Sequence, residues 1–154
     1  MKTLLLESIR QADGRYLSDA ELKPLETYVR SFAVRFNTYN LLQEKSDTLI
    51  LQTLRKLVQT HRRTVQEHSS KCQRDMAYTL ACISQAILLD DEPGFIEGYV
   101  IWMQNITRAL HKEDSAVQAY RLLQAEVAAM LPAESAQLIN HHLDSLIKAF
   151  SESA

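Results

Sequence analysis

The chain has 154 residues, a length that suits one domain with one hydrophobic core, so we expect a single domain spanning residues 1–154. Hydrophobic residues make up 46% and charged residues 23%, which is ordinary for a globular protein and excludes a disordered chain. The formal net charge of −2 offers no general attraction for nucleic acid or for an anionic membrane. No stretch reaches transmembrane length and the N-terminal apolar run is short, so we expect no membrane span, no signal peptide and a cytoplasmic protein.

Glycine and proline are scarce in this chain, with three residues of each. A sheet protein of this length needs many tight turns that are rich in these residues. The composition therefore predicts an all-α protein, and the spacing of apolar residues and turn signals along the chain predicts seven or eight helices.

The first helix is expected over the apolar residues 4–9, and it should stop at Gly14, where glycine can adopt the left-handed conformation. Ser18 begins the next helix, because Glu21 follows three residues later in a capping-box pattern. Pro24 conflicts with that start, since proline inside a helix removes a hydrogen bond and clashes one turn back. The sequence thus leaves two starts open, at Ser18 and beyond Pro24.

The middle of the chain predicts two further helices. Residues 46–47 (Ser-Asp) are typical of a helix start, and apolar residues follow at helical spacing. The polar stretch QEHSSK (66–71) interrupts that spacing, and a long helix should run from about Ser70 to Leu89. The stretch DDEPG then ends it, with Pro93 suited to the first turn of the next helix behind an acidic cap.

Two boundaries divide the remainder of the chain into three predicted helices. A helix is expected from Phe95 to about Leu110, with Trp102 in the core or at an interface, and the next helix should start near Asp114 or Ser115. Pro132 marks the last boundary. The final helix carries an apolar core stripe that consists of Leu138, Ile139, His142, Leu143, Leu146, Ile147 and Phe150.

The stretch KCQRDMAYTL (71–80) is the strongest candidate for a binding site. Helical spacing places Cys72 and Asp75 on one face, with Arg74 on its flank. A thiol can form a thioether with an unsaturated substituent of a bilin, a linear tetrapyrrole. An aspartate can accept hydrogen bonds from pyrrole N–H groups, and the arginine fork matches a propionate carboxylate.

Simpler interpretations apply to the same residues. A single helical cysteine is usually a small core residue, and an Arg-Asp neighbour pair is usually solvated. We expect Cys82 to pack in the core. Cys72 and Cys82 lie ten residues apart in one predicted helix, about 15 Å along its axis, which is too far for a disulfide between them.

Other combinations of residues do not indicate a metal site, a binding site or a catalytic site. His61 and His68 would lie about 10 Å apart on one helix, and His141 and His142 point in different directions, so neither pair can hold one metal ion. The basic residues within 55–63 fit a solvated helix face. There is no catalytic triad, phosphate loop or strong metal-ligand spacing, so we expect no enzymatic activity and no metal.

Three stretches of the chain resemble the phycobiliprotein family, the pigment proteins of cyanobacterial antennae. The resemblance begins at QADGRYLSDAEL (11–22) and is clearest at CQRDMAYTLACISQAILLDDEPGFIEGYV (72–100), with its Cys-x-Arg-Asp pattern. It continues more weakly through DSAVQAYRLLQAEVAAML (114–131). The resemblance implies a globin-like fold with an added N-terminal helical pair.

Site roles follow from this resemblance by position. Cys72 would be the attachment thiol of a bilin, Asp75 the partner of its inner pyrrole nitrogens and Arg74 a partner of a propionate. Thr79 and Ala81 depart from the family pattern, which has a tyrosine and an arginine there. That arginine is associated with subunit pairing, so its absence argues against standard antenna assembly.

Two functions are therefore predicted. The first is a non-enzymatic accessory or regulatory protein of bilin or tetrapyrrole biosynthesis, acting as a homodimer or with a partner from the phycobilisome or from tetrapyrrole metabolism. The alternative is a light-harvesting protein that carries a phycocyanobilin-like pigment on Cys72. The lost assembly residues favour the first, and the retained Cys-Arg-Asp set favours the second.

Overall fold

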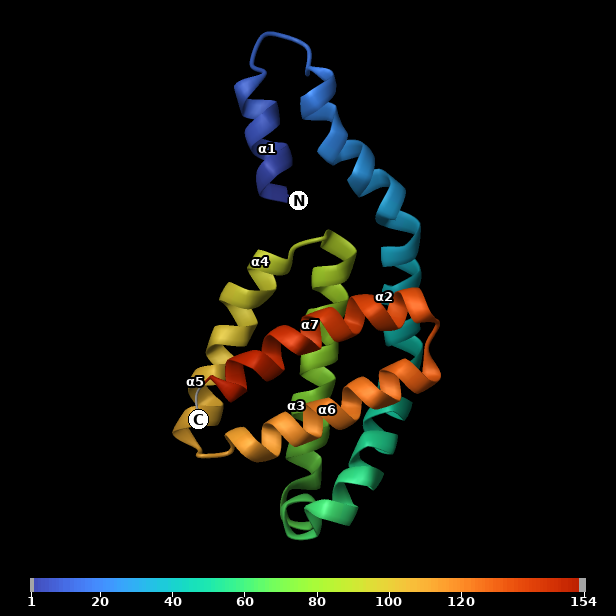
Figure 1. Ribbon diagram of the computed structural model, residues 1–154, viewed down its shortest axis with the longest axis vertical. Helices are drawn as coiled ribbons and strands as arrows, with labels where there is room; N and C mark the ends of the chain where they lie inside the picture. The colour runs from blue at the N-terminus through green and yellow to red at the C-terminus, as the bar shows by residue number, and fades with distance from the viewer. Residues whose placement is uncertain (1, 153–154) are drawn as a thin grey trace.

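The structure, a computed structural model, describes residues 2–152, without the side chains of residues 2–4 and 64, so the side chain of Leu4 in the first predicted helix lies outside it. The described residues form helices and contain no strand, as predicted (Figure 1). In chain order the elements are α1 (Lys2–Gln11), α2 (Asp19–Thr60), α3 (Arg62–Leu89), α4 (Glu92–Phe95), the π-helical η1 (Ile96–Val100), α5 (Ile101–Ala109), α6 (Glu113–Met130) and α7 (Ala133–Ser151).

The helical body has two crossed layers. The C-terminal part of α2 packs along α3, and the antiparallel pair α6 and α7 lies across them (Figure 1). The apolar faces of these four helices meet in one core, and α7 contributes the predicted stripe, with Ile139, Leu143, Leu146 and Phe150 fully buried. His142 is also buried, as its place in the stripe predicts.

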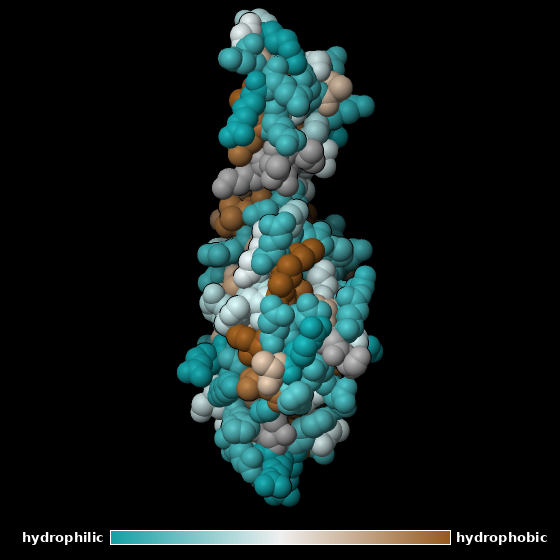
Figure 2. All heavy atoms as spheres, turned by 90° about the vertical axis from the view of Figure 1, so that its left-hand side faces the viewer, coloured by the Kyte–Doolittle hydropathy of each residue, from teal (hydrophilic) through white to brown (hydrophobic). Residues whose placement is uncertain are grey.

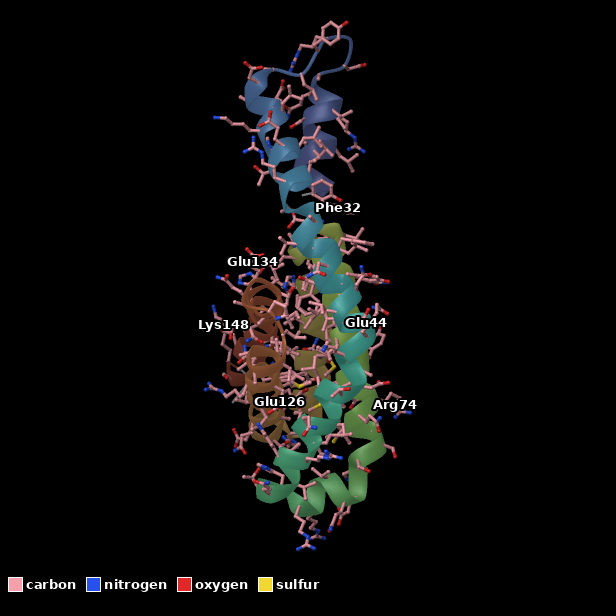
Figure 3. All side chains as sticks on the ribbon, turned by 90° about the vertical axis from the view of Figure 1, so that its right-hand side faces the viewer. Phe32, Glu44, Arg74, Glu126, Glu134 and Lys148 are labelled. Atoms are coloured by element: carbon pink, nitrogen blue, oxygen red, sulfur yellow. The ribbon has the colours of Figure 1, made fainter. Side chains whose placement is uncertain are left out.

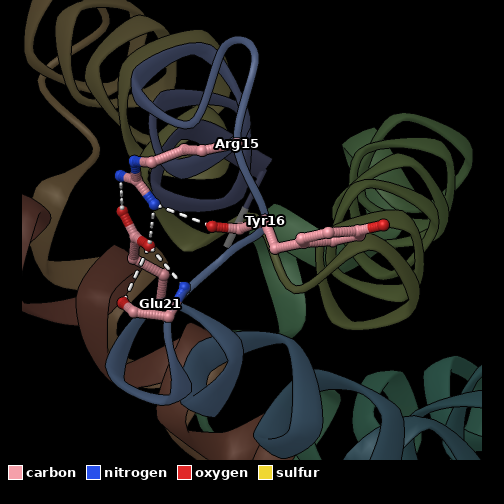
Figure 4. Close-up of polar contacts among 4 residues, drawn as sticks. Arg15, Tyr16 and Glu21 are labelled. Carbon is pink, nitrogen blue, oxygen red and sulfur yellow. Dashed lines mark hydrogen bonds and ion pairs between the residues drawn. The ribbon is translucent and has the colours of Figure 1, made fainter.

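The start of α2 confirms the capping pattern at Ser18. The carboxylate of Glu21 accepts hydrogen bonds from the main-chain N–H of Ser18 at 2.7 Å and from the guanidinium of Arg15 at 2.8 and 3.0 Å (Figure 4). Arg15 also donates to the main-chain oxygen of Tyr16. The hydrogen bonds from Arg15, followed by those from Ser18, hold the pKa of the Glu21 carboxyl far below its usual value. The helix begins at Asp19 and continues through Pro24.

The predicted helix start at residues 46–47 is wrong, because α2 runs without a break to Thr60. Instead of capping a new helix, the Ser46 hydroxyl donates back to the main-chain oxygen of Leu42 within the same helix. Leu42 and Leu49 are both buried and lie two turns apart on one face. The core stripe of α2 therefore continues across the position where the sequence indicated a boundary.

The predicted interruption at QEHSSK appears as a kink, and the chain remains helical on both sides of it. The break between α2 and α3 lies at His61, with φ −130° and ψ 48°, so α3 starts eight residues before the predicted Ser70. Inside α3, His68 has φ −134° and ψ 23°, values outside the helical range. From there α3 runs to Leu89, the predicted end.

The later boundaries agree with the sequence. The Asp91 side chain accepts a hydrogen bond from the main-chain N–H of Gly94, with Pro93 in the first turn, as the acidic stretch predicted. Helical structure then continues from α4 through η1 and α5 to Ala109. Pro132 precedes α7, as expected. Within residues 2–152, no helix combines the length and the apolar character needed to cross a membrane.

The N-terminal helical pair projects from the body as an arm, which consists of α1 and the first part of α2 (Figure 1). Gly14, with φ +78°, forms the turn between them. Several large apolar side chains of the arm are exposed, and they include Ile9, Val29, Phe32 and Phe36. Phe32 lies near the base of the arm (Figure 3), and apolar groups are visible among hydrophilic ones on the face shown in Figure 2.

Candidate functional site

A cavity of about 520 Å³ opens beside the first half of α3. Cavities that hold small organic ligands have volumes of roughly 300–1,000 Å³. Four segments line it: the end of α2, the part of α3 around Cys72, the helical stretch from Tyr99 to Leu110, and the start of α6.

Cys72, Arg74 and Asp75 all line this cavity. Cys72 and Asp75 are half-buried and lie one turn apart on α3. Arg74 is exposed and points away from the helical body (Figure 3), so it contributes to the rim. The structure brings the three residues to one hollow, and their roles toward a pigment remain a prediction.

The thiol of Cys72 is the nucleophilic group of the cavity. Burial raises its pKa above the usual value, and the negative charge of Asp75 raises it further, while Lys112 and Lys71 oppose the shift. The group is therefore a neutral thiol at neutral pH, and a reaction that needs the thiolate depends on proton removal.

The carboxylate of Asp75 is available as an acceptor. Neither Arg74 nor any other residue between 2 and 152 forms a hydrogen bond or an ion pair with it in the described structure. The carboxylate is half-buried and has no protein donor, so it is open to solvent or to the donor groups of a ligand. Asp75 thus offers both of its oxygens to N–H groups of a ligand.

Aromatic side chains form one wall of the cavity. The ring of Tyr99 packs edge-on against Tyr78, with 5.6 Å between centroids, and lies 6.2 Å from the ring of Trp102. Phe95 stacks on Tyr99 from the core side, with 5.6 Å between centroids. Tyr99 is buried, whereas Tyr78 and Trp102 are about half exposed at the mouth. Such a wall suits a flat, conjugated ligand.

The rim of the cavity is basic. Lys71, Arg74 and Lys112 line it, and His61 and His68 lie at the two non-helical points on either side of the first turns of α3. Asp75 is the one acidic side chain among the lining residues that the structure describes. The rim therefore favours anionic substituents on a ligand.

A buried hydroxyl cluster lies behind the aromatic wall. The hydroxyl oxygen of Thr79 is 2.6 Å from the Tyr99 hydroxyl and 2.8 Å from the Tyr120 hydroxyl. The sequence marked Thr79 only as a departure from the family pattern, and Tyr120 was not predicted as part of a site at all. Tyr120 lies 41 residues further along the chain, so no local pattern could connect the two.

The remaining candidates lie elsewhere. Cys82 is half-buried, packs against the core as predicted, and does not line the cavity. His141 pairs with Glu92 at 2.9 Å, away from the site. Within the described part of the chain, no cluster of three or more His, Cys, Asp or Glu residues is arranged to hold a metal ion.

An all-α body with an N-terminal helical arm, and with Cys-x-Arg-Asp beside a lateral cavity, is an architecture of the globin-like class. The family model described as phycobilisome protein matches residues 7–150, and the chain belongs to this family. The resemblance predicted from residues 11–131 is therefore confirmed.

Curated relatives match almost the whole length of this chain in sequence. The chain is 26% identical to allophycocyanin subunit alpha 1 of Nostoc sp. (strain PCC 7120), over 96% of this chain and 98% of the relative. It is 24% identical to allophycocyanin alpha chain 2 of Microchaete diplosiphon, with 94% and 97% covered. It is also 24% identical to the allophycocyanin alpha chain of Synechocystis sp. (strain PCC 6714), with 97% and 99% covered.

These relatives bear on the two predicted functions. None of their names describes a role in tetrapyrrole synthesis, so the accessory function that the sequence departures favoured gains no support. The light-harvesting alternative agrees better with the family and with the relatives.

Proposed function

We propose that this protein is a non-enzymatic light-harvesting component of phycobilisomes that holds a linear tetrapyrrole in the cavity through a thioether to Cys72. The observation that carries the proposal is that Cys72, Arg74 and Asp75 line one cavity of about 520 Å³ beside an aromatic wall. When bound, such a pigment supplies the conjugated system that absorbs visible light. The cytoplasmic location expected from the sequence is part of this proposal.

The acceptor groups of the cavity suit the pyrrole N–H groups of such a pigment, and its donor groups suit the propionates. Asp75 carries an unpaired carboxylate that can accept hydrogen bonds from pyrrole N–H groups. Arg74, Lys71 and Lys112 lie on the rim, where they can pair with propionates without losing their own hydration. Cys72 lies one turn from Asp75, so the covalent and the polar attachment come from the same helix.

The wall of the cavity also suits a pigment that must stay rigid. Tyr99 is 5% exposed and is held between Phe95, Tyr78 and Trp102, so its ring cannot move without disturbing the core. A fixed wall limits twisting of a bound conjugated molecule, and twisting is a route by which an excited state loses energy without emitting light.

Reconstitution tests the proposal. The protein is incubated with phycocyanobilin, with and without a bilin lyase, and separated on a denaturing gel that is stained with zinc. We expect a fluorescent covalent band that is lost in Cys72→Ala. Cys82→Ala is the matched control, because Cys82 is a half-buried thiol of the same helix outside the cavity. The absence of a band under every condition contradicts the proposal, as does its retention in Cys72→Ala.

We further propose that the arm pairs with a second protein chain, either another copy or a phycobilisome partner. The rings of Phe32 and Phe36 stack with 5.8 Å between centroids, and both are almost half exposed together with Val29. Sedimentation should show a species larger than 17.6 kDa that Phe36→Glu dissociates. Leu51→Glu is the control, since Leu51 is a similarly exposed residue of α2 outside the arm. Equal sedimentation of all three proteins argues against this surface.

A further inference from the structure

The hydroxyl cluster behind the cavity wall consists of three side chains from three elements. Thr79 of α3 is fully buried, and Tyr99 of η1 and Tyr120 of α6 are each 5% exposed. Both tyrosines line the cavity, whereas Thr79 does not. Its hydroxyl oxygen lies 2.6 Å from that of Tyr99, 2.8 Å from that of Tyr120 and 2.9 Å from the main-chain oxygen of Asp75.

Counting hydrogens fixes the direction of each bond. Thr79 makes three contacts of hydrogen-bond length, and the three hydroxyl groups supply one hydrogen each. The Tyr99 and Tyr120 hydroxyls also lie close enough to interact with each other, but the short contacts to Thr79 need a hydrogen in each of them. The carbonyl of Asp75 has no hydrogen, so the Thr79 hydroxyl must donate to it. The two remaining contacts must then be donated by Tyr99 and Tyr120. The Thr79 oxygen has two lone pairs, which are the number required to accept both.

The arrangement determines what the tyrosines can offer to the cavity. A phenol has one O–H, and in both residues it is directed toward Thr79. Only oxygen lone pairs remain for a ligand. Together with the unpaired Asp75 carboxylate, the inner side of the cavity presents acceptors, while its rim presents the donors Lys71 and Lys112.

We propose that Thr79 is a positioning residue that holds the Tyr99 and Tyr120 hydroxyls as hydrogen-bond acceptors, so that the cavity selects a ligand face that carries N–H groups. The part of this inference that concerns the ligand rests on the proposed function. For a linear tetrapyrrole, the cluster favours a bound form in which a ring N–H, and not a ring carbonyl, faces the two tyrosines. The direction of the hydroxyl bonds does not depend on any ligand.

The substitution Thr79→Val tests the cluster with little change in shape. Valine removes the shared acceptor, so both buried phenols lose the atom to which they donate. Thr79→Ser keeps the hydroxyl and should behave as the unsubstituted protein. Thr53→Val is the matched control, because Thr53 is also fully buried in a helix and its hydroxyl also donates four residues back, to Leu49.

A measurement without pigment reports whether the tyrosine hydroxyls donate hydrogen bonds. Ultraviolet resonance Raman spectroscopy distinguishes tyrosine hydroxyls that donate strongly from those that do not, through the intensity ratio of the tyrosine doublet. We expect a changed ratio in Thr79→Val and the unsubstituted ratio in Thr79→Ser and Thr53→Val. Tyr120→Phe should remove part of the donor signal. An unchanged ratio in Thr79→Val overturns the inference.

A binding measurement then tests selection of the ligand face. In a Cys72→Ala background, phycocyanobilin is titrated and quenching of Trp102, the one tryptophan of the chain, is followed. We expect Thr79→Val to weaken binding about fivefold, the effect of one hydrogen bond, and Thr79→Ser to leave it unchanged. Equal affinity in Thr79→Val and the parent protein overturns the role toward the ligand.

The two measurements separate this inference from the proposed function. If phycocyanobilin binds neither the parent protein nor any variant, the proposed function fails, and the selection of a tetrapyrrole face is overturned with it. The Raman result still decides whether Thr79 directs the tyrosine hydroxyls. If the pigment binds and attaches to Cys72 while Thr79→Val matches the parent in both measurements, the proposed function stands and this inference fails.

Discussion

Arg35 of α2 donates a hydrogen bond from its guanidinium to the main-chain oxygen of Leu88 at the end of α3. The guanidinium also donates to the main-chain oxygens of Ile87 at 3.5 Å and of Tyr28 at 2.8 Å, and it lies 4.1 Å from the centroid of the Tyr28 ring. Arg35 is 3% exposed, so these partners replace water almost completely. The residue joins the base of the arm to the last turn of α3, where the helix leaves carbonyls without partners.

Replacement of Arg35 should therefore destabilise the protein strongly. Arg35→Met keeps an apolar stem and leaves the carbonyl of Leu88 without its donor, whereas the carbonyl of Ile87 still accepts from the main-chain N–H of Asp90, and we expect a loss of about 2–4 kcal/mol in the free energy of unfolding. Urea unfolding measures it. Arg30→Met is the control, since Arg30 is exposed and its pair with Glu26 at 3.9 Å should contribute less than about 1 kcal/mol. Similar losses in both variants would contradict this role.

The sequence predicted the fold where local chemistry decides the structure. The cap at Ser18, the turn at Gly14 and the acidic start before Pro93 each depend on residues within one or two turns. The predicted boundary at Ser46 failed for the opposite reason. A serine can cap a helix or bond back within one, and only the continuous buried face of α2 decides between them.

The sequence likewise predicted only the part of the candidate site that depends on residues close together in the chain. Cys72 and Asp75 lie one turn apart, so their common face followed from helical spacing alone. Tyr99, Trp102 and Tyr120 reach the cavity from elements that lie 20 residues or more away, and their position depends on how η1, α5 and α6 pack on α3. The direction of the Thr79 bonds needed the distances between three side chains, which no pattern in a single sequence contains.

The two buried tyrosines should make stability sensitive to alkaline pH. Burial is the main cause that raises the pKa of Tyr99 and of Tyr120 above the ordinary value of 10.0. The unfolded chain therefore releases these protons at a pH where the folded protein still holds them. Their stabilising effect is complete below pH 10 and is lost as the pH rises beyond it, by about 1.4 kcal/mol per pH unit for each tyrosine.

Urea unfolding between pH 9 and 11 measures this loss. A protein with both Tyr99→Phe and Tyr120→Phe should be less stable at neutral pH, because Thr79 loses its partners, yet its stability should decline less above pH 10. Tyr16→Phe is the control, since Tyr16 is 98% exposed, and it should retain the decline of the unsubstituted protein. Parallel pH profiles for the double variant and the unsubstituted protein would refute the prediction.

His142 should make stability sensitive to acid. Burial lowers the pKa of its imidazole below the ordinary value of 6.5, and Nδ1 lies 2.9 Å from the main-chain oxygen of Leu138, to which it donates. The folded protein thus holds a neutral ring, while the unfolded chain takes up a proton near pH 6.5. This part of the stability is complete above that pH and is lost as the pH falls through the lowered pKa.

Chemical unfolding at pH 7 and pH 5 tests the role of His142. His142→Met keeps an apolar side chain beside Phe95 and should show a smaller loss between the two pH values than the unsubstituted protein. His141→Met is the neighbouring control, because His141 is exposed, and it should retain most of the loss. A loss in His142→Met as large as that of the unsubstituted protein would show that another group is responsible.

The reactivity of Cys72 should depend on the two charges beside it. After burial, Asp75 is the next cause that raises the pKa of the thiol, and Lys112 opposes it. In a Cys82→Ala background only Cys72 can react, so the rate of alkylation by iodoacetamide at pH 8 reports its thiolate fraction. We expect Asp75→Asn to raise this rate about twofold or more and Lys112→Gln to lower it. The two substitutions remove charges of opposite sign at the same cavity. If both change the alkylation rate in the same direction, altered access to the thiol is the cause. That outcome would contradict electrostatic control of its pKa.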